Sequence, residues 1–369
     1  MADRVGQGEV VLVTGGSGFL GQHVVKLIQE RDLKVCEIRV LDLKPYTNRL
    51  GHKERLIVKQ YVGDIVDIAS VRGAFRGVDC VFHCAALVDY QYPPDYEALD
   101  SVNVAGTQNV ISLCLEFRVP RLVFSSTTEV TLTPYFGSIY SLVVNQTEKR
   151  ALPPKTDNSL LLPGYPASKL RAERFVLDAN GTPFPQGNGF LMTVALRPTL
   201  LYGELDTHII PDLIRLSKMF NGVLPRFAGS GGRQQITYVG NAAWAHILAK
   251  NELLTTRPGG GIAGLPIFIT DDTPVVDLLR FVERMSNGCR LSRWYFPSIF
   301  AYVTAAVIEL LLRITKMRLP ASPRGAVSYL GSLIMYSRLR ADLHLDYFSI
   351  FQPEECYAIS AKYYSNTEF

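Results

Sequence analysis

Several features that would assign a protein to a common class are scarce or missing in this sequence. The 369 residues contain no run of five lysines and arginines, and the formal net charge is only +4, so nucleic-acid binding is not indicated. The six cysteines form no C-x-x-C pair, which disfavours a metal site and favours free thiols in a reducing compartment. No basic stretch followed by an apolar stretch opens the chain, so we expect no cleaved signal peptide. We find no internal repeat.

The composition that is present indicates a large folded protein. Apolar residues make up 47% of the chain and charged residues 20%, which excludes a disordered chain. The length is sufficient for one large α/β domain and a smaller second domain.

The N-terminal segment EVVLVTGGSGFLGQHVVKLIQE predicts a strand, a glycine-rich turn and an amphipathic helix over about residues 19–30. Gly15 can form the tight turn, Gly18 lets the backbone approach a pyrophosphate, and Gly21 lets the helix pack on the strand. The free N–H groups at the start of the helix would then hold the phosphate. The glycine spacing therefore predicts a dinucleotide site.

The next predicted strand, EIRVLD, ends at Asp42. A carboxylate in this position can accept hydrogen bonds from an adenosine ribose and repel a 2′-phosphate. Asp42 therefore predicts a preference for NAD over NADP, which the nearby Lys44 weakens slightly. The alternative is that Asp42 only begins a surface loop.

Further alternation of strands and helices follows in LIVKQYVGD, CVFHCAAL, LDSVNVAGTQNVISLCLEF and RLVFSS. Repeated strand–helix units predict an α/β fold with a Rossmann-type, doubly wound parallel sheet. Ligands of such sheets lie beyond the carboxyl ends of the strands. Those ends carry Gly15, Asp42, Asp64, Ala85 and the SSTTE stretch, so we expect them to converge at one edge.

The stretch GYPASKLRAE places Tyr165 four residues before Lys169 at the start of a predicted helix, so the two side chains share one face. A lysine there can lower the pKa of the tyrosine from its usual value of about 10. The phenol could then donate and accept a proton near neutral pH. The same spacing also occurs on solvated helix surfaces, so the pair alone does not establish a catalytic site.

These motifs together resemble the extended short-chain dehydrogenases/reductases. The resemblance is carried by TGGSGFLG, GD at 63–64, HCAALVD, VNVAGTQNV, FSSTTEV, YPASK and LRPTLLYG, and it spans most of residues 9–360. Within that superfamily, YVGNAAWAHILA, ITDDTP and SRWYFP are similar to the 3β-hydroxysteroid dehydrogenase/Δ5-Δ4 isomerase family.

The resemblance implies roles for particular residues. Tyr165 would be the catalytic acid/base, and Lys169 would lower its pKa and bind the nicotinamide ribose. The serine position of the family falls on Thr127, and Ser126 would replace it if the alignment is shifted by one residue. No metal is implied. The implied NAD-binding residues are Gly15, Gly18, Phe19, Leu20, Gly21, Asp42, Asp64, Ile65, Ala85, Ala86, Tyr165, Lys169 and Pro198.

Two further features bear on the chemistry. The tyrosine and lysine to which the family's isomerisation has been assigned, just after DDTP, are absent from DDTPVVDLLRFVERMSNG. Isomerisation therefore stays open. His83 lies on a predicted buried strand and His246 in the apolar AWAHILA segment, and we assign neither a catalytic role.

Residues 294–312, WYFPSIFAYVTAAVIELLL, contain one charged residue, Glu309, and are flanked by arginines and lysines. The length suits a membrane span, or a buried helix of a substrate domain. Members of the family that are membrane-bound carry an apolar segment here. The resemblance therefore implies association with a membrane, that of the endoplasmic reticulum or else a mitochondrial one, and a hydrophobic steroid taken from the bilayer.

The chain organisation changes near residue 200. We expect residues 1–202 and 236–261 to form the NAD-binding domain, and residues 203–235 and 262–369 to form a smaller C-terminal substrate-binding domain. The block GSGG at 229–232 reads as a turn. The oligomeric state is open, with a homodimer as one alternative.

Three functions are compatible with the sequence. The first is NAD-dependent oxidation of a steroid 3β-hydroxyl, with or without Δ5-Δ4 isomerisation. The second is a sterol-4-carboxylate 3-dehydrogenase (decarboxylating) or a dehydrogenase of another hydrophobic alcohol. The third is a non-catalytic dinucleotide-binding redox sensor, which the retained tyrosine and lysine disfavour. A sugar-nucleotide epimerase is disfavoured because the apolar segment suits no sugar nucleotide.

Overall fold

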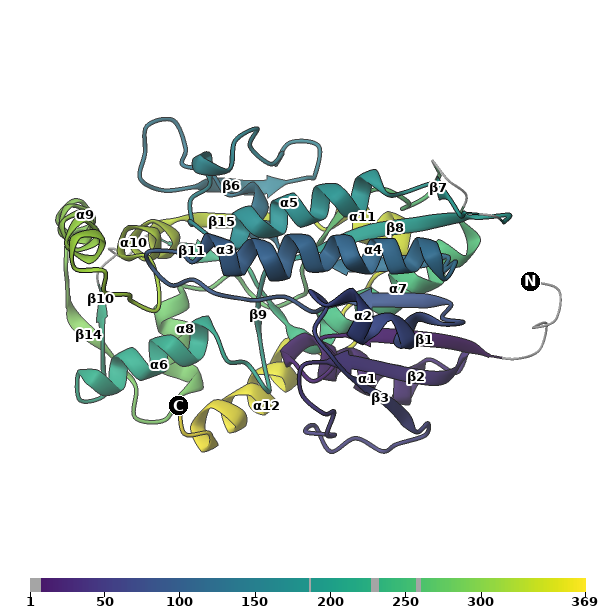
Figure 1. The fold of residues 1–369 in the computed structure, drawn as a ribbon. Helices are drawn as coiled ribbons and strands as arrows, with labels where there is room; N and C mark the ends of the chain where they lie inside the picture. The colour runs from purple at the N-terminus through teal and green to yellow at the C-terminus, as the bar shows by residue number, and fades with distance from the viewer. Residues whose placement is uncertain (1–7, 186, 227–231, 257–259) are drawn as a thin grey trace.

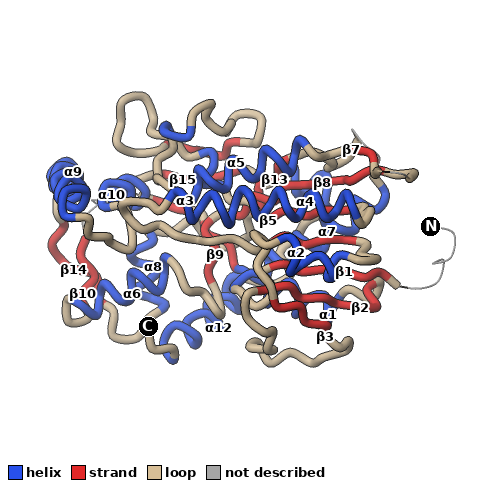
Figure 2. Tube along the Cα trace, in the orientation of Figure 1, coloured by secondary structure: helices blue, strands red, loops and turns tan. Residues whose placement is uncertain are grey.

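The computed structural model describes residues 8–185, 187–226, 232–256 and 260–369. Its centre is a sheet of parallel strands with helices on both faces (Figures 1 and 2). The strand order is β3-β2-β1-β4-β5-β8-β13, and a short antiparallel strand, β7, pairs with β8. The strands are β1 (Glu9–Thr14), β2 (Val35–Asp42), β3 (Val58–Val62), β4 (Cys80–His83), β5 (Arg121–Ser125), β7 (Thr182–Pro183), β8 (Phe190–Pro198) and β13 (Pro266–Ile269).

Strand β1 shows why this sheet is covered on both faces. Val11 and Val13 join one core cluster and Leu12 joins another on the opposite face, because successive side chains of a strand point to opposite sides. Helices α1 (Phe19–Arg31), α7 (Val239–Thr255) and α11 (Leu339–Leu345) cover the first face. The second is covered by α2 (Ile68–Val71), the 3-10 turn Arg72–Phe75, α4 (Gly106–Glu116) and α5 (Tyr165–Asp178). Helix α3 (Tyr96–Leu99) continues into α4 through a π-helical stretch, Asp100–Ala105.

A smaller region lies beyond the carboxyl ends of the strands, at the left of Figure 1. It contains three small parallel sheets, β10–β14, β11–β15–β6 and β12–β9, around a core of its own. Its strands are β6 (Leu142–Gln146), β9 (Leu200–Tyr202), β10 (Val223–Arg226), β11 (Arg233–Gln234), β12 (Ile236–Tyr238), β14 (Arg290–Tyr295) and β15 (Leu333–Tyr336). Its helices are α6 (Ile209–Met219), α8 (Leu278–Met285), α9 (Ser298–Thr315), α10 (Pro323–Gly331) and α12 (Pro353–Asn366), and 3-10 turns span Thr128–Thr131 and Asp157–Ser159.

The chain divides between the two regions differently from the sequence-based expectation at several elements, which include β9, β12 and α11 as well as the two strands that follow. Strand β13, expected in the smaller domain, pairs with β8 and forms the edge of the main sheet. Strand β6, expected in the dinucleotide-binding domain, pairs with β15 in the smaller region. Both pairings join residues far apart in the chain, which no local pattern reveals. Helix α7 does return to the main sheet and packs on α1, as predicted. The predicted turn at 229–232 lies outside the described residues except for Gly232.

The apolar segment 294–312 is not one helix. Trp294 and Tyr295 end strand β14, and α9 begins only after Pro297. Helix α9 is long and apolar enough to cross a membrane, with a mean hydropathy of 1.7, and no other helix of the described residues meets that test. Only 22% of it is buried, so most of the apolar surface of α9 is exposed.

The inner face of α9 is nevertheless firmly packed on the protein. Ala301 and Ala305 join a small core with Val327 of α10. Glu309, which is 2% exposed, accepts hydrogen bonds from Ser322 Oγ at 2.6 Å and Arg324 Nε at 2.7 Å. The one charge of the segment is therefore neutralised inside the protein.

Candidate active site

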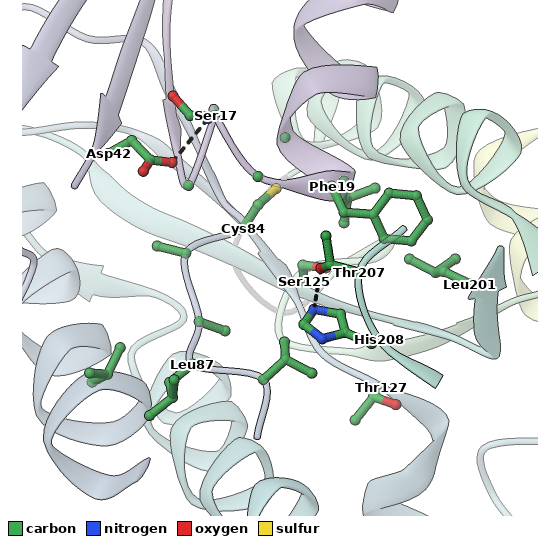
Figure 3. A pocket seen from close by; sticks show the side chains of 18 of the residues that line it. Ser17, Phe19, Asp42, Cys84, Leu87, Ser125, Thr127, Leu201, Thr207 and His208 are labelled. Atoms are coloured by element: carbon green, nitrogen blue, oxygen red, sulfur yellow. Dashed lines mark hydrogen bonds between the residues drawn. The ribbon is translucent and has the colours of Figure 1, made fainter. Parts of the chain in front are cut away.

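A cavity of 540 Å³ lies at the carboxyl edge of the main sheet. In Figure 3, Ser17 and Asp42 lie at one end and Thr127 at the other, with Cys84, Ser125 and His208 between them. Every residue predicted for the site lines this cavity: Gly15, Gly18, Phe19, Leu20, Gly21, Asp42, Asp64, Ile65, Ala85, Ala86, Ser126, Thr127, Tyr165, Lys169 and Pro198.

The glycine turn between β1 and α1 has the geometry that a dinucleotide pyrophosphate requires. Gly15 has a φ of +69°, and a Cβ there would lie 2.6 Å from Ala85 N. A Cβ on Gly21 would lie 2.1 Å from Gly15 O, so neither position accepts a side chain. Gly18 caps α1 without a side-chain hydrogen bond, which leaves N–H groups of the first helical turn directed at the cavity.

Asp42 holds the other side of this turn. Its Oδ2 accepts a hydrogen bond from Ser17 N at 3.0 Å, and its Oδ1 accepts one from Lys44 N at 3.2 Å. The carboxylate is thereby fixed at the end of β2, where further lone pairs can accept bonds from a ribose. Asp64 accepts a bond from Val66 N at 2.9 Å. These contacts fit the adenosine end of a dinucleotide.

Tyr165 and Lys169 stand one turn apart at the start of α5, and both are buried. Lys169 Nζ lies 4.1 Å from the centroid of the Phe124 ring, and burial lowers the pKa of this lysine to about 7. Burial also raises the pKa of Tyr165 above its ordinary value, and the nearby Glu129 carboxyl reinforces that rise. The predicted lowering of the Tyr165 pKa by Lys169 is therefore not seen in the protein alone, because desolvation of the phenolate dominates.

The structure distinguishes the two candidate hydroxyl groups. Ser126 Oγ donates to Glu173 Oε2 at 2.5 Å, and the same oxygen accepts from Arg197 Nε at 2.9 Å. The Ser126 hydroxyl proton is therefore already donated within a buried cluster with Glu173 and Arg197. Thr127 Oγ1 accepts a bond from Glu129 N at 3.2 Å and caps the following 3-10 turn, so its proton can still be donated to a ligand. The geometry therefore favours Thr127 over Ser126 as the hydroxyl that binds the ligand.

Two residues beside Tyr165 were not predicted as part of the site. Tyr90 donates from its hydroxyl to both carboxylate oxygens of Glu129, at 2.8 and 3.0 Å. Its ring centroid lies 5.3 Å from that of Tyr165. Glu129 is 5% exposed, and burial raises its pKa to about 7. Glu129 lies in the SSTTE stretch and Tyr90 directly follows HCAALVD, but nothing in the local sequence indicates that the two side chains meet.

The segment before α6 supplies another unpredicted part of the cavity. His208 enters it between Thr207 and the start of α6, and burial lowers the pKa of its ring. A second cavity of 320 Å³ shares Val88, Tyr90 and His208 with the first and extends to Arg318. Apolar side chains line much of the main cavity: Leu87, Val88, Val102, Leu200, Leu201, Leu205 and Ile209.

The two histidines to which no catalytic role was assigned are fully buried. The ring of His83 contacts Thr14 Oγ1 at 2.7 Å and Thr107 Oγ1 at 3.0 Å. His246 Nδ1 lies 2.8 Å from Ala242 O within α7. Neither side chain lines the cavity.

Comparisons with known proteins agree with this architecture. The sequence model of the 3-beta hydroxysteroid dehydrogenase/isomerase family matches residues 12–297. Among solved structures, gox2253 is 23% identical with a TM-score of 0.68, covering 96% of this chain and 98% of that one. The UDP-glucose 4-epimerase of Thermus thermophilus, solved with NAD, is 22% identical with a TM-score of 0.64, covering 97% and 100%. MoeE5, solved with UDP-glucuronic acid and NAD, is 20% identical with a TM-score of 0.65, covering 96% and 98%. At these identities the likeness establishes the fold alone.

Proposed function

The chain belongs to the 3-beta hydroxysteroid dehydrogenase/isomerase family, and from this membership and the cavity we propose that it oxidises a steroid 3β-hydroxyl with NAD as the acceptor. The observation that carries the proposal is the meeting of Thr127, Tyr165 and Lys169 with the glycine turn in one cavity whose other walls are largely apolar.

The three polar side chains divide the chemistry between them. The Thr127 hydroxyl donates a hydrogen bond to the alcohol oxygen, and the Tyr165 phenolate accepts the proton of that alcohol and becomes the neutral phenol. Lys169, one turn along α5, supplies positive charge that favours the phenolate when the lysine is protonated. The glycine turn would hold NAD, which would supply the acceptor for the hydride of the carbinol carbon. Holding the reacting atoms together supplies the orientation that the transfer requires.

The walls of the cavity support a hydrophobic alcohol as substrate. Leu87, Val88, Leu201, Leu205 and Ile209 offer apolar surface to a fused-ring hydrocarbon. A sugar nucleotide needs hydrogen-bonding partners for each hydroxyl group, because buried polar groups left unpaired cost affinity. The likeness to epimerases is one of fold, so we retain the steroid proposal.

We also propose that the protein rests on a membrane through α9. The inner face of this helix and Glu309 are packed on α10, so the helix lies along the bilayer surface and does not cross it. Arg293 and Lys316 flank it and suit anionic headgroups. The proposed location is the membrane of the endoplasmic reticulum, with a mitochondrial membrane as the alternative. The exposed apolar side chains on and around it include Trp294, Ile299, Phe300, Val303, Val307, Leu310, Leu311 and Ile314.

The oxidation is tested by NADH formation in membranes carrying the wild-type chain, Tyr165→Phe, or the exposed control Tyr96→Phe. Each receives NAD or NADP with a Δ5-3β-hydroxysteroid, a 4-carboxysterol or farnesol. We expect NADH from the steroid, a loss of about 10²–10⁴-fold in Tyr165→Phe, and no loss in Tyr96→Phe. Turnover of only the 4-carboxysterol or only farnesol would move the substrate to that alcohol. NAD binding without any turnover would instead indicate a sensor.

The membrane contact is tested by flotation with liposomes that contain anionic lipid. We expect the wild-type protein to float and the double variant Ile299→Asp, Phe300→Asp to remain in solution. Leu33→Asp is the control, because Leu33 is 79% exposed and lies between α1 and β2 of the main sheet region, away from α9 in the fold. Equal flotation of all three proteins would disprove the assignment of α9.

A further inference from the structure

The second cavity, of 320 Å³, adjoins the main one and has no part in the oxidation just described. We propose that it binds the end of the steroid that lies remote from the reacting hydroxyl, and that it selects substrates that carry a second hydroxyl group at that end. This inference rests on the proposed function, because it concerns the substrate of that oxidation.

The second cavity opens from the catalytic end of the main cavity. Val88, Tyr90 and His208 line both cavities. The ring centroid of Tyr90 lies 5.3 Å from that of Tyr165, whereas the residues of the glycine turn line the main cavity and not the second one. A steroid whose 3β-hydroxyl is held by Tyr165 can therefore extend past Tyr90 into the second cavity.

The volumes of the two cavities support this path. The main cavity measures 540 Å³, and a pocket for a single drug-sized ligand typically measures about 300–1,000 Å³. The oxidation requires two molecules to be bound at once, a dinucleotide and a four-ring steroid. Because the main cavity has the size of one such ligand, the steroid needs the adjoining 320 Å³ as well.

The walls of the second cavity are more polar than the apolar walls that face the steroid rings. Its polar side chains are Asp89, Gln91, His208, Asp212 and Arg318. A hydrocarbon placed against these groups would remove their water and give no hydrogen bond in return, which costs free energy. The cavity therefore suits a substrate end that itself forms hydrogen bonds.

Carboxylates outnumber cations around the second cavity. Asp212 is paired with Arg215, and Arg318 Nη1 lies 3.4 Å from Asp95 Oδ2. Asp89 also lines the cavity and forms no ion pair among the described residues. One negative charge is therefore left without a cation, and it would repel a sulfate or carboxylate group on the substrate.

The side chains that line the cavity include several hydrogen-bond acceptors. Asp89 Oδ1 accepts from Gln91 N at 2.9 Å, and a carboxylate has further lone pairs for a ligand. His208 lies at the start of α6, one turn before Asp212, so the two residues share a helix face. Burial lowers the pKa of the His208 ring, so the imidazole is neutral near pH 7 and keeps one acceptor nitrogen.

A hydroxyl group matches these partners better than the other common polar groups of a steroid. It can donate to the Asp212 carboxylate and accept from the Arg318 guanidinium. A ketone only accepts, so it would leave the carboxylates without a donor. A sulfate ester only accepts as well, and it adds a negative charge beside Asp89.

The experiment measures kcat/KM for NADH formation by full-length protein with four Δ5-3β-hydroxysteroids that differ only at C17, which carries a 17β-hydroxyl, a ketone, a sulfate ester or hydrogen. The variants are Asp212→Ala and Asp89→Asn, and the control is Asp178→Ala, an exposed acid at the end of α5. Each variant is compared with wild type on the same substrate, so differences in solubility between the steroids cancel.

We expect Asp212→Ala to lower kcat/KM for the 17β-hydroxyl steroid by about 10- to 100-fold and to leave the value for the 17-hydrogen steroid unchanged. Asp89→Asn should raise kcat/KM for the sulfate ester several-fold. Asp178→Ala should match wild type on all four steroids. Equal NAD binding by all the proteins shows that the variants are folded.

The 17-hydrogen steroid separates the two proposals. If Asp212→Ala lowers kcat/KM equally for the hydroxyl and hydrogen steroids, or changes neither, the assignment of the second cavity is overturned and the dehydrogenase stands. If the wild-type protein forms no NADH from any of the four steroids, the proposed function itself fails, and the subsite fails with it.

Discussion

The buried carboxyl of Glu129 should impose a pH dependence on the stability of the whole protein. Burial raises its pKa from an ordinary 4.5 to about 7. Between these two values the folded state keeps a proton that the unfolded state has lost, so stability falls as the pH rises through this window. At 1.36 kcal/mol per pKa unit, the loss amounts to about 3 kcal/mol in full, and to about 2.5 kcal/mol between pH 5 and pH 8.

Glu129→Gln removes this contribution while keeping the size and shape of the side chain. We therefore expect the unfolding free energy of the variant, relative to wild type, to rise by about 2–3 kcal/mol from pH 5 to pH 8. Urea titrations of both proteins at the two pH values measure this difference, and Glu30→Gln, an exposed acid, is the control. A difference that is the same at both pH values would refute the reasoning, because it would mean that Glu129 titrates alike in the folded and unfolded states.

Three further substitutions test other parts of the structure. Gly21→Ala should weaken NAD binding in calorimetry at least about tenfold, or 1.4 kcal/mol, because its Cβ would lie 2.1 Å from Gly15 O; unchanged affinity would argue against the phosphate cradle. Asp42→Ala should raise the kcat/KM for NADP relative to that for NAD by about 10- to 100-fold, because it removes a negative charge that repels the 2′-phosphate of NADP. Steady-state kinetics with both dinucleotides measure this ratio, and an unchanged ratio would mean that the carboxylate only caps the loop. Arg324→Ala should lower the unfolding free energy by about 1–3 kcal/mol, because Glu309 is 2% exposed and would lose its cation; no change in a denaturation curve would contradict this.

The parts of the molecule that local sequence determines could be predicted. The glycine turn follows from a strand, a glycine spacing and an amphipathic helix, and the structure has α1 at Phe19–Arg31 where the pattern expects a helix over about 19–30. The pairing of Tyr165 with Lys169 follows from helical periodicity. Each of these features depends on residues within a few turns of one another, which the sequence shows directly.

The parts that depend on distant contacts could not be predicted. Tyr90 and Glu129 are 39 residues apart and meet only because β4 and β5 are neighbours in the sheet. The choice of Thr127 over Ser126 depends on Glu173, which lies on α5 and takes the Ser126 hydroxyl. The pKa of Tyr165 depends on the depth of its burial, and a motif carries no information on depth.

The same distant pairings limit how the two regions can move. The chain enters the smaller region at β6, returns to the main sheet at α5 and β8, and leaves again at β9. It comes back at α7 and β13, leaves at α8, returns at α11 and leaves once more at α12. A hinge motion between two rigid regions needs only one or two connecting segments to bend. In this molecule, separating the two regions would require all of the connecting segments to bend together. The cleft between the regions is therefore mechanically stiff, and adaptation to a ligand falls to short loops such as residues 205–208.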